Sequence, residues 1–162
     1  MRIPLQHKRA VALLSMLAPL AAIAGQTYTN EPAKAAIRTQ LARYEQALNA
    51  SDVDGVMKLY AADAVFMPQN SQPAVGRESV RNAYRHVFET IRLNIGFTID
   101  EIQPLSQDWA YARTRSSGTV KVLESSQPAA PEGNQEIFLF HREADGQWRF
   151  ARYIFSTTNP AR

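Results

Sequence analysis

The stretch from Ala42 to Tyr84 constrains the fold of this chain most, because it combines helical periodicity with tyrosines at positions 44, 60 and 84. Apolar residues separated by four, three and four positions lie on one face of a helix, and Ile37, Leu41, Tyr44 and Leu48 have this spacing. The pattern predicts a helix over residues 31–50. Tyr44 is therefore expected to face the interior.

Two further helices are expected after the first. Ser51, with the acid Asp54 three residues later, is typical of a helix N-terminus. The apolar side of this second helix would carry Val56, Leu59 and Tyr60. A brief strand over residues 64–67 and a turn-rich loop over 68–76 would precede a third helix over 77–91. Its inner face would consist of Val80, Tyr84, Val87, Phe88 and Ile91.

The second half of the chain has the two-residue period of strands. Apolar residues alternate with polar ones from Leu93 to Ile99, and further strands are expected over 109–122, 135–142 and 147–156. Asp145-Gly146 is a strong hairpin signal, whereas the Ser- and Pro-rich segment 124–134 predicts a mobile hairpin connection. Helices followed by a meandering antiparallel sheet predict an α+β fold. We expect a cone-shaped α+β barrel, in which three N-terminal helices pack in a curved antiparallel sheet and leave a cavity.

Alternation along the last two strands predicts which side chains face the cavity. The inward set is expected to be Glu136, Phe138, Phe140, Ala151, Tyr153 and Phe155. The outer face of the last strand would then carry Trp148, Phe150, Arg152 and Ile154. Such a face is too apolar for bare solvent and predicts a homodimer packed sheet against sheet.

The helical half resembles ketosteroid isomerase and SnoaL-like proteins of the nuclear-transport-factor-two-like superfamily. The likeness extends over nearly all of residues 29–160. The residues that carry it are Arg43-Tyr44, Ala47-Leu48-Asn49-Ala50, Asp52, Asp54-Gly55, Leu59-Tyr60-Ala61, Asp63-Ala64, Gly76 and Tyr84.

The resemblance implies roles for individual residues. Tyr44 falls on the tyrosine of the oxyanion hole, and Tyr60 and Tyr84 fall on positions that supply a supporting tyrosine network in some relatives. The run from Glu136 to Phe140 is similar to the strand that bears the second oxyanion donor, a protonated acid, with Glu136 at its position. Tyr44 and Glu136 are therefore the candidate catalytic residues.

One position departs from the isomerase pattern. The general base should follow Asp63-Ala64-Val65, where this chain has Met67 or Pro68, and neither side chain accepts a proton. Proton abstraction next to a carbonyl needs a basic group within hydrogen-bond reach, so steroid isomerisation is not expected. Polyketide-cyclase relatives place acid–base groups elsewhere in the cone. Here the candidates are Asp63, Asp100 and Glu136.

The first 24 residues are predicted to be a secretory signal peptide, followed by one domain over residues 25–162. Arg2, Lys8 and Arg9 precede an apolar run over residues 10–20, and small residues occupy the usual cleavage positions at 22–24. The run is too short to span a bilayer, and no later stretch approaches the roughly 20 apolar residues that a transmembrane helix needs. We therefore expect a secreted or periplasmic protein that does not associate with the membrane after signal cleavage.

Composition limits the kinds of partner and cofactor that we expect this protein to bind. Of 18 Lys and Arg residues, three lie in the predicted leader, so 15 remain against 15 Asp and Glu. The basic pI is thus a property of the leader, and no nucleic-acid partner is expected. Two histidines, His86 and His141, with scattered acids give no metal-ligand spacing, and no phosphate loop or dinucleotide motif is present. We expect no metal and no cofactor, and the absence of cysteine leaves stability to core burial.

These observations favour an exported protein that binds a small apolar or carbonyl-containing molecule, with isomerase- or cyclase-like proton transfer as its chemistry. Tyr44 and Glu136 would lie deep in the pocket and Gln69 and Asn70 near its mouth. The remaining expected pocket residues are Tyr60, Tyr84, Phe138 and Tyr153.

Purely structural roles for these residues remain open at this point. The tyrosines could be core residues whose hydroxyls reach a neighbour, and Glu136 could pair with an arginine, for which the candidates are Arg113, Arg115 and Arg152. The whole domain could instead be a non-catalytic association module with a filled cone. A closed interior favours that module, whereas several hundred cubic ångströms open to solvent favours ligand binding.

Overall fold

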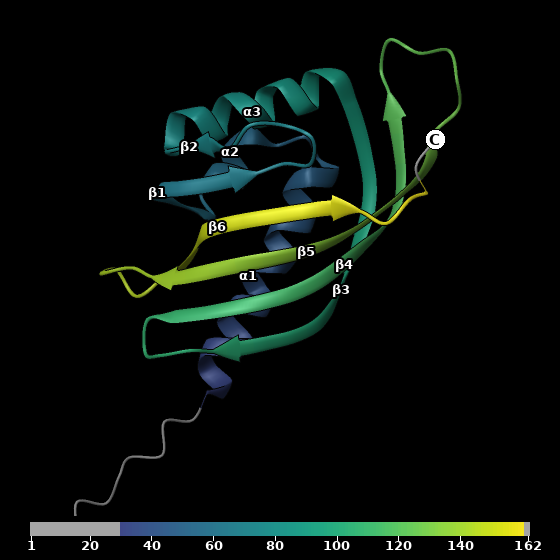
Figure 1. Cartoon of the computed structure of the whole chain (residues 1–162). Coiled ribbons are helices and arrows are strands. Elements are labelled where there is room, and N and C mark those ends of the chain that lie inside the picture. The colour runs from purple at the N-terminus through teal and green to yellow at the C-terminus, as the bar shows by residue number, and fades with distance from the viewer. Residues whose placement is uncertain (1–29, 161–162) are drawn as a thin grey trace, which may run out of the picture.

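Three helices and a six-stranded sheet make up residues 30–160, the part of the chain that this computed structural model describes (Figure 1). The predicted signal peptide lies outside these residues. In chain order the elements are α1 (Glu31–Asn49), α2 (Val53–Met57), β1 (Tyr60–Met67), β2 (Ala74–Val75), α3 (Arg77–Thr90), β3 (Ile91–Pro104), β4 (Trp109–Val122), β5 (Ala130–Arg142) and β6 (Trp148–Thr157).

The sheet is curved and unclosed, and the helices precede its four long strands, which confirms the predicted α+β cone (Figure 1). The strand order is β2-β1-β6-β5-β4-β3. All neighbours are antiparallel except β1 and β6, which run parallel. α1 crosses one side of the long strands, and α3 lies beside β1 and β2 (Figure 1). The helices thus cover the concave side and bury the cone's interior.

The predicted apolar stripe of α1 is confirmed: Ile37, Leu41, Tyr44 and Leu48 are all buried. The cap of α2 is Asp52, not Ser51, since the Asp52 carboxylate accepts a hydrogen bond from the backbone N–H of Gly55 at 2.9 Å. Ser51 instead has a positive φ of 54° in the turn between the helices. α2 is therefore only five residues long, and Tyr60 begins β1 rather than lying on a helix.

Strand pairing makes β1, β3 and β5 longer than predicted and ends α3 one residue earlier. β1 begins at Tyr60 rather than at residue 64, and α3 ends at Thr90 because Ile91 already pairs with Val122 of β4. β5 begins at Ala130, inside the segment predicted to be a mobile connection. Its ladder with β4 continues through Pro131 and Gly133, so cross-strand hydrogen bonding outweighs the local turn composition there.

A bulge in β6 overturns one prediction about its faces. Leu139 lies opposite Arg152 and Phe140 lies opposite Phe150, so Ala151 is an extra residue in β6. Because the bulge reverses the alternation, Phe150 is fully buried and Trp148 is 4% exposed. The prediction that Trp148 and Phe150 form an outer apolar face was therefore wrong.

Replacing Phe150 tests this register. We expect Phe150→Ala to lower the free energy of unfolding by about 3–5 kcal/mol, because it leaves a cavity in the core. Ile154→Ala, at a side chain 47% exposed on the same strand, should cost less than about 1 kcal/mol. Urea denaturation of both variants measures the two values, and equal small losses would show that Phe150 is not a core residue.

Candidate functional site

A chain of three tyrosine hydroxyls lies where α1, β1 and α3 meet. The Tyr84 hydroxyl is 2.5 Å from that of Tyr44 and 2.8 Å from that of Tyr60. All three residues are at most 1% exposed. A buried hydroxyl without a partner is costly, so each tyrosine stabilises the placement of the other two.

The two hydrogen bonds of this tyrosine cluster do not use all of its protons. Three hydroxyls carry three protons, and the two hydrogen bonds between them use two. When Tyr60 donates to Tyr84 and Tyr84 donates to Tyr44, the Tyr44 proton is left for a further acceptor, and a hydrogen bond with Tyr44 partly offsets the rise that burial causes in the pKa of the neighbouring Tyr153. Tyr44 lines the internal cavity described below and Tyr60 does not, so this direction leaves that proton at the cavity wall.

The cluster holds these protons firmly. Burial has the largest effect and raises the pKa of Tyr44, Tyr60 and Tyr84. Neighbouring tyrosines raise the pKa of Tyr44 and Tyr60 further. The pKa of Tyr153 is raised by burial, then by Tyr84 and by the Glu136 carboxyl. These phenols are therefore hydrogen-bond donors at neutral pH rather than bases.

Glu136 is a buried carboxyl on the inner face of β5, and only 3% of it is exposed. Thr114 donates a hydrogen bond to its Oε2 from the neighbouring strand, and Ser116 adds hydrogen bonds from its side chain and backbone. Burial is the main cause that raises the pKa of Glu136, and the Asp100 charge adds to it, while the hydroxyl contacts oppose it. The carboxyl thus holds its proton to a higher pH than an exposed glutamate does.

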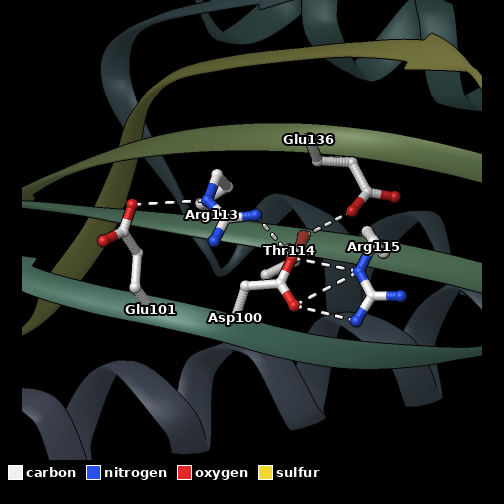
Figure 2. A network of polar contacts seen from close by, with 6 residues as sticks. All are labelled: Asp100, Glu101, Arg113, Thr114, Arg115 and Glu136. Carbon is white, nitrogen blue, oxygen red and sulfur yellow. Dashed lines mark hydrogen bonds and ion pairs between the residues drawn. The ribbon is translucent and has the colours of Figure 1, made fainter.

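The arginines that could have neutralised Glu136 are engaged elsewhere. A bulge in β3 at Asp100 places its carboxylate on the outer face of the sheet, 2.7 Å from Arg113 Nη1 and 2.9 Å from Arg115 Nη2 (Figure 2). Arg152 donates to the backbone carbonyl oxygens of Asp63 and Ala151. Glu136 therefore contacts hydroxyl groups. The alternative in which it pairs with an arginine would have placed a cation at this carboxyl instead.

A cavity of about 140 Å³ lies inside the cone between the phenols and this carboxyl. Aromatic and aliphatic side chains dominate its wall, with Ser116, Glu132, Asn134 and Glu136 as a polar strip from β4 and β5. The remaining lining residues are Tyr44, Leu48, Phe66, Tyr84, Val87, Ile91, Leu93, Ile95, Phe97, Tyr153 and Phe155. The volume lies between a filled interior and the several hundred cubic ångströms of many ligand pockets.

The cavity approaches solvent at one end of the cone. The half-buried members of its wall are Val87, Ile91, Leu93, Phe97, Glu132 and Phe155. All but Phe97 come from the end of α3, the start of β3, the start of β5 and the end of β6, which lie at the same end of the sheet (Figure 1).

Four of the eight residues predicted for the site line this cavity: Tyr44, Tyr84, Glu136 and Tyr153. Tyr60 lies behind Tyr84, and Phe138 stacks on Tyr153 with ring centroids 4.1 Å apart. Gln69 and Asn70 lie away from it: the Gln69 amide oxygen accepts a hydrogen bond from the backbone N–H of Thr157, and Asn70 is an exposed turn residue with a φ of 56°.

The other acid–base candidates, Asp63 and Asp100, are also outside the cavity wall, on the surface and on the outer sheet face respectively. Sequence reasoning missed Ser116, Glu132 and Asn134. Asn134 is two residues before Glu136, so the alternation that placed Glu136 inward also places Asn134 inward. The prediction missed it because the strand was expected to begin at residue 135 and not at Ala130.

Within residues 30–160, no three His, Cys, Asp or Glu side chains are grouped so as to hold a metal ion. None of the helices in this described range has the length and apolar character needed to cross a membrane. The polar groups that the cavity wall does contain are phenols, the carboxyl groups of Glu132 and Glu136, the amide of Asn134 and the hydroxyl of Ser116.

Comparison with known proteins agrees with this architecture. The family model of the SnoaL-like domain matches residues 41–151. A ketosteroid isomerase-like protein from Erwinia carotovora atroseptica is 32% identical in sequence, with a TM-score of 0.74 over 78% of this chain and 96% of that one. The chain therefore belongs to the SnoaL-like family, which confirms the resemblance seen in the sequence.

More distant structures share the fold. A proposed scytalone dehydratase from Novosphingobium aromaticivorans is 19% identical, with a TM-score of 0.70 over 80% of this chain and 87% of that one. A nuclear-transport-factor-two-like superfamily protein from Salmonella enterica is 14% identical, with a TM-score of 0.71 over 82% of this chain and 95% of that one. The cone is thus common to proteins of different description, and function must be argued from the site.

The raised pKa of Glu136 predicts how stability depends on pH. Its folded-state pKa exceeds the unfolded one, so the stability it contributes is present below the unfolded pKa and is lost as pH rises through the folded pKa. Glu136→Gln does not titrate. We expect the stability of this variant relative to the native protein to increase from about pH 4 to about pH 8. Urea denaturation across that range measures the difference.

Glu89→Gln is the matched control, because Glu89 is an exposed glutamate on α3. Its stability relative to the native protein should stay nearly constant over the same range. A constant difference for Glu136→Gln as well would contradict the raised pKa.

Proposed function

We propose that this protein is an exported small-molecule-binding member of the SnoaL-like family, whose cone takes up a small, largely apolar molecule that carries a carbonyl oxygen. One observation carries the proposal: the buried phenol of Tyr44 and the buried carboxyl of Glu136 line the same cavity, which is otherwise mostly apolar. A few polar groups in an apolar hollow are typical of ligand sites. The leader-like residues 1–24 support export to the periplasm or outside the cell.

The tyrosine chain would act on the carbonyl oxygen. Tyr44 donates its proton to that oxygen in place of Tyr153, and Tyr84 and Tyr60 support the donor through two further hydrogen bonds. Removal of a proton from the carbon next to the carbonyl moves negative charge onto the oxygen, and preorganised donors stabilise that charge. This is proton-transfer chemistry of the isomerase or cyclase type.

Glu136 would complete the site in one of two ways. As a carboxylate it takes the proton from the neighbouring carbon and returns it to another. As a neutral acid it only donates a second hydrogen bond to the carbonyl oxygen, and the site then binds the molecule without a base to start turnover. The two roles differ in one outcome: an amide at position 136 still donates a hydrogen bond but cannot carry a proton, so Glu136→Gln abolishes turnover in the first case and keeps binding in the second.

A ligand screen tests the site. We expect small ketones and enones, with 2-cyclohexen-1-one as the reference, to raise the melting temperature of the mature protein because they bind only the folded state. Tyr44→Phe should weaken binding about tenfold, since one hydrogen bond to the carbonyl is lost. Glu136→Gln should also alter the affinity. Thermal shift and titration calorimetry measure both changes.

Tyr111→Phe is the matched control for this screen. Tyr111 is a half-buried tyrosine on β4 that is not part of the cavity wall, so this variant should respond as the native protein does. Identical responses from the native protein, Tyr44→Phe and Glu136→Gln would remove the site assignment.

A second function, association through the outer sheet face, is favoured by a separate observation. Ile137 and Ile154 lie opposite each other on β5 and β6 and are 40% and 47% exposed. With Arg113, Arg115, Gln135 and Ser156 they border a shallow groove of about 310 Å³. Exposed apolar patches of this kind mark association sites, and a two-fold dimer would pair the face with itself.

A charge on this face should disrupt the homodimer. We expect the native protein to have twice the mass of one chain by light scattering, and Ile154→Lys to be monomeric because it buries a charge at the interface. Leu105→Lys, at a 58% exposed residue in the turn after β3, is the control and should remain dimeric. A monomeric native protein, or a dimeric Ile154→Lys, would contradict association through this face.

A further inference from the structure

The ionisable side chains of the cavity wall are all acidic or phenolic. Glu132 and Glu136 contribute carboxyl groups, and Tyr44, Tyr84 and Tyr153 contribute phenols. In the part of the chain that the structure describes, no lysine, arginine or histidine lines this cavity. A charge that leaves water is costly unless a group of opposite charge is close to it. The wall can therefore stabilise a positive ligand group, but it has no cation for a negative one.

Glu132 lies at the mouth of the cavity, the end that approaches solvent. The residue is half-buried and belongs to the inner face of β5, four residues before the buried Glu136. Four residues of a strand span roughly 13 Å, so one carboxyl lies at the mouth and the other inside the cone. Gly118 pairs with Glu132 on β4 and has no side chain that could cover it.

A neutral neighbour holds the Glu132 carboxylate in place. Asn134 Nδ2 donates to Glu132 Oε1 at 3.0 Å and to Ser116 Oγ at 3.3 Å. An amide orients a carboxylate without cancelling its charge. None of the ion pairs within residues 30–160 includes Glu132. A ligand at the mouth therefore meets a negative charge.

Two basic residues at this end of the sheet bind backbone carbonyl groups instead. Arg92, near the start of β3, donates to the carbonyl oxygens of Phe88 and Ile91. Lys121 on β4 donates to two carbonyl oxygens of the turn that follows its strand. Arg92 and Lys121 pair across the two strands, and neither lines the cavity. Neither cation is therefore part of the wall that a ligand would contact.

We propose that the cavity selects its ligand by charge: it takes a carbonyl compound whose end at the mouth is neutral or positively charged, and it rejects one that carries a carboxylate there. This inference rests on the proposed function and adds the class of substrate. It assigns Glu132 as a specificity-determining residue, which no motif in the sequence indicated. Like charges in a partly buried site repel strongly enough to change an affinity by about tenfold.

Two pairs of cyclic ketones test the charge selection, and the members of each pair are matched in shape. 4-Oxocyclohexanecarboxylate is negative where 4-oxocyclohexanecarboxamide is neutral. 1,1-Dimethyl-4-oxopiperidinium is positive where 4,4-dimethylcyclohexanone is neutral. By titration calorimetry on the mature native protein at neutral pH, we expect the carboxylate to bind about tenfold more weakly than the carboxamide. This comparison does not depend on the folding of any variant.

Glu132→Gln locates the effect. Glutamine keeps the shape of the side chain and an oxygen that accepts from Asn134 Nδ2, but it removes the charge. We expect the affinity for the carboxylate to rise about fivefold and that for the piperidinium to fall about fivefold, while both neutral ketones bind as before. A merely structural role of Glu132 would change all four affinities in the same direction, and that result would overturn the inference.

Glu89→Gln is the matched control, because it removes one negative charge from the surface of α3, outside the cavity wall. Its four affinities should stay within about twofold of the native values, since solvent and salt screen an exposed charge. Equal effects of the two variants would trace the selection to the net charge of the protein and would contradict the role of Glu132.

The outcomes separate this inference from the proposed function. Equal affinity of the native protein for the carboxylate and the carboxamide would overturn the charge selection, while weaker ketone binding by Tyr44→Phe would still support the site. A native protein that binds neither the neutral ketones nor 2-cyclohexen-1-one would overturn the proposed function and this inference with it.

Discussion

The hydrogen-bonded chain of Tyr44, Tyr84 and Tyr60 is the interaction on which the arrangement of this domain depends. It joins α1, α3 and β1 at one buried point, and each hydroxyl satisfies a neighbour that water cannot reach. Loss of one member leaves a buried polar group at a cost of about 1–3 kcal/mol. Tyr44 and Tyr84 also line the cavity, so packing and the cavity wall share one network.

Two bulges distribute the remaining polar groups between the faces of the sheet. The bulge at Asp100 places a carboxylate beside Arg113 and Arg115 on the outer face, where the three charges satisfy one another. The inner face keeps hydroxyl groups and Glu136, whose carboxyl accepts a hydrogen bond from Thr114. The bulge at Ala151 turns Phe150 into the core. One side of the cavity is consequently apolar and the other carries hydrogen-bonding groups. This arrangement suits the proposed ligand, a largely apolar molecule with a carbonyl oxygen.

Sequence reasoning reached the fold class and much of the cavity wall from periodicity. The helical stripe that included Tyr44 and the alternation that turned Glu136, Phe138 and Tyr153 inward depend only on the repeat of each element. It failed where pairing with another strand decides the outcome. The faces of Trp148 and Phe150 were reversed by a bulge, and Gln69 and Asn70 lie away from the cavity because the loop folds against β6 and its turn.

The sequence by itself determined that this chain forms amphipathic helices followed by curved strands, with an inward phenol and an inward carboxyl, because side-chain periodicity is a local property. Only the tertiary structure decided which groups share the cavity and which lack a partner. Asn134 shows the difference: its amide is an ordinary polar residue in the sequence. Glu132 and Ser116 turn its oxygen into an unsatisfied acceptor only when the strands are paired, since hydrogen-bond satisfaction depends on contacts between segments far apart in the chain.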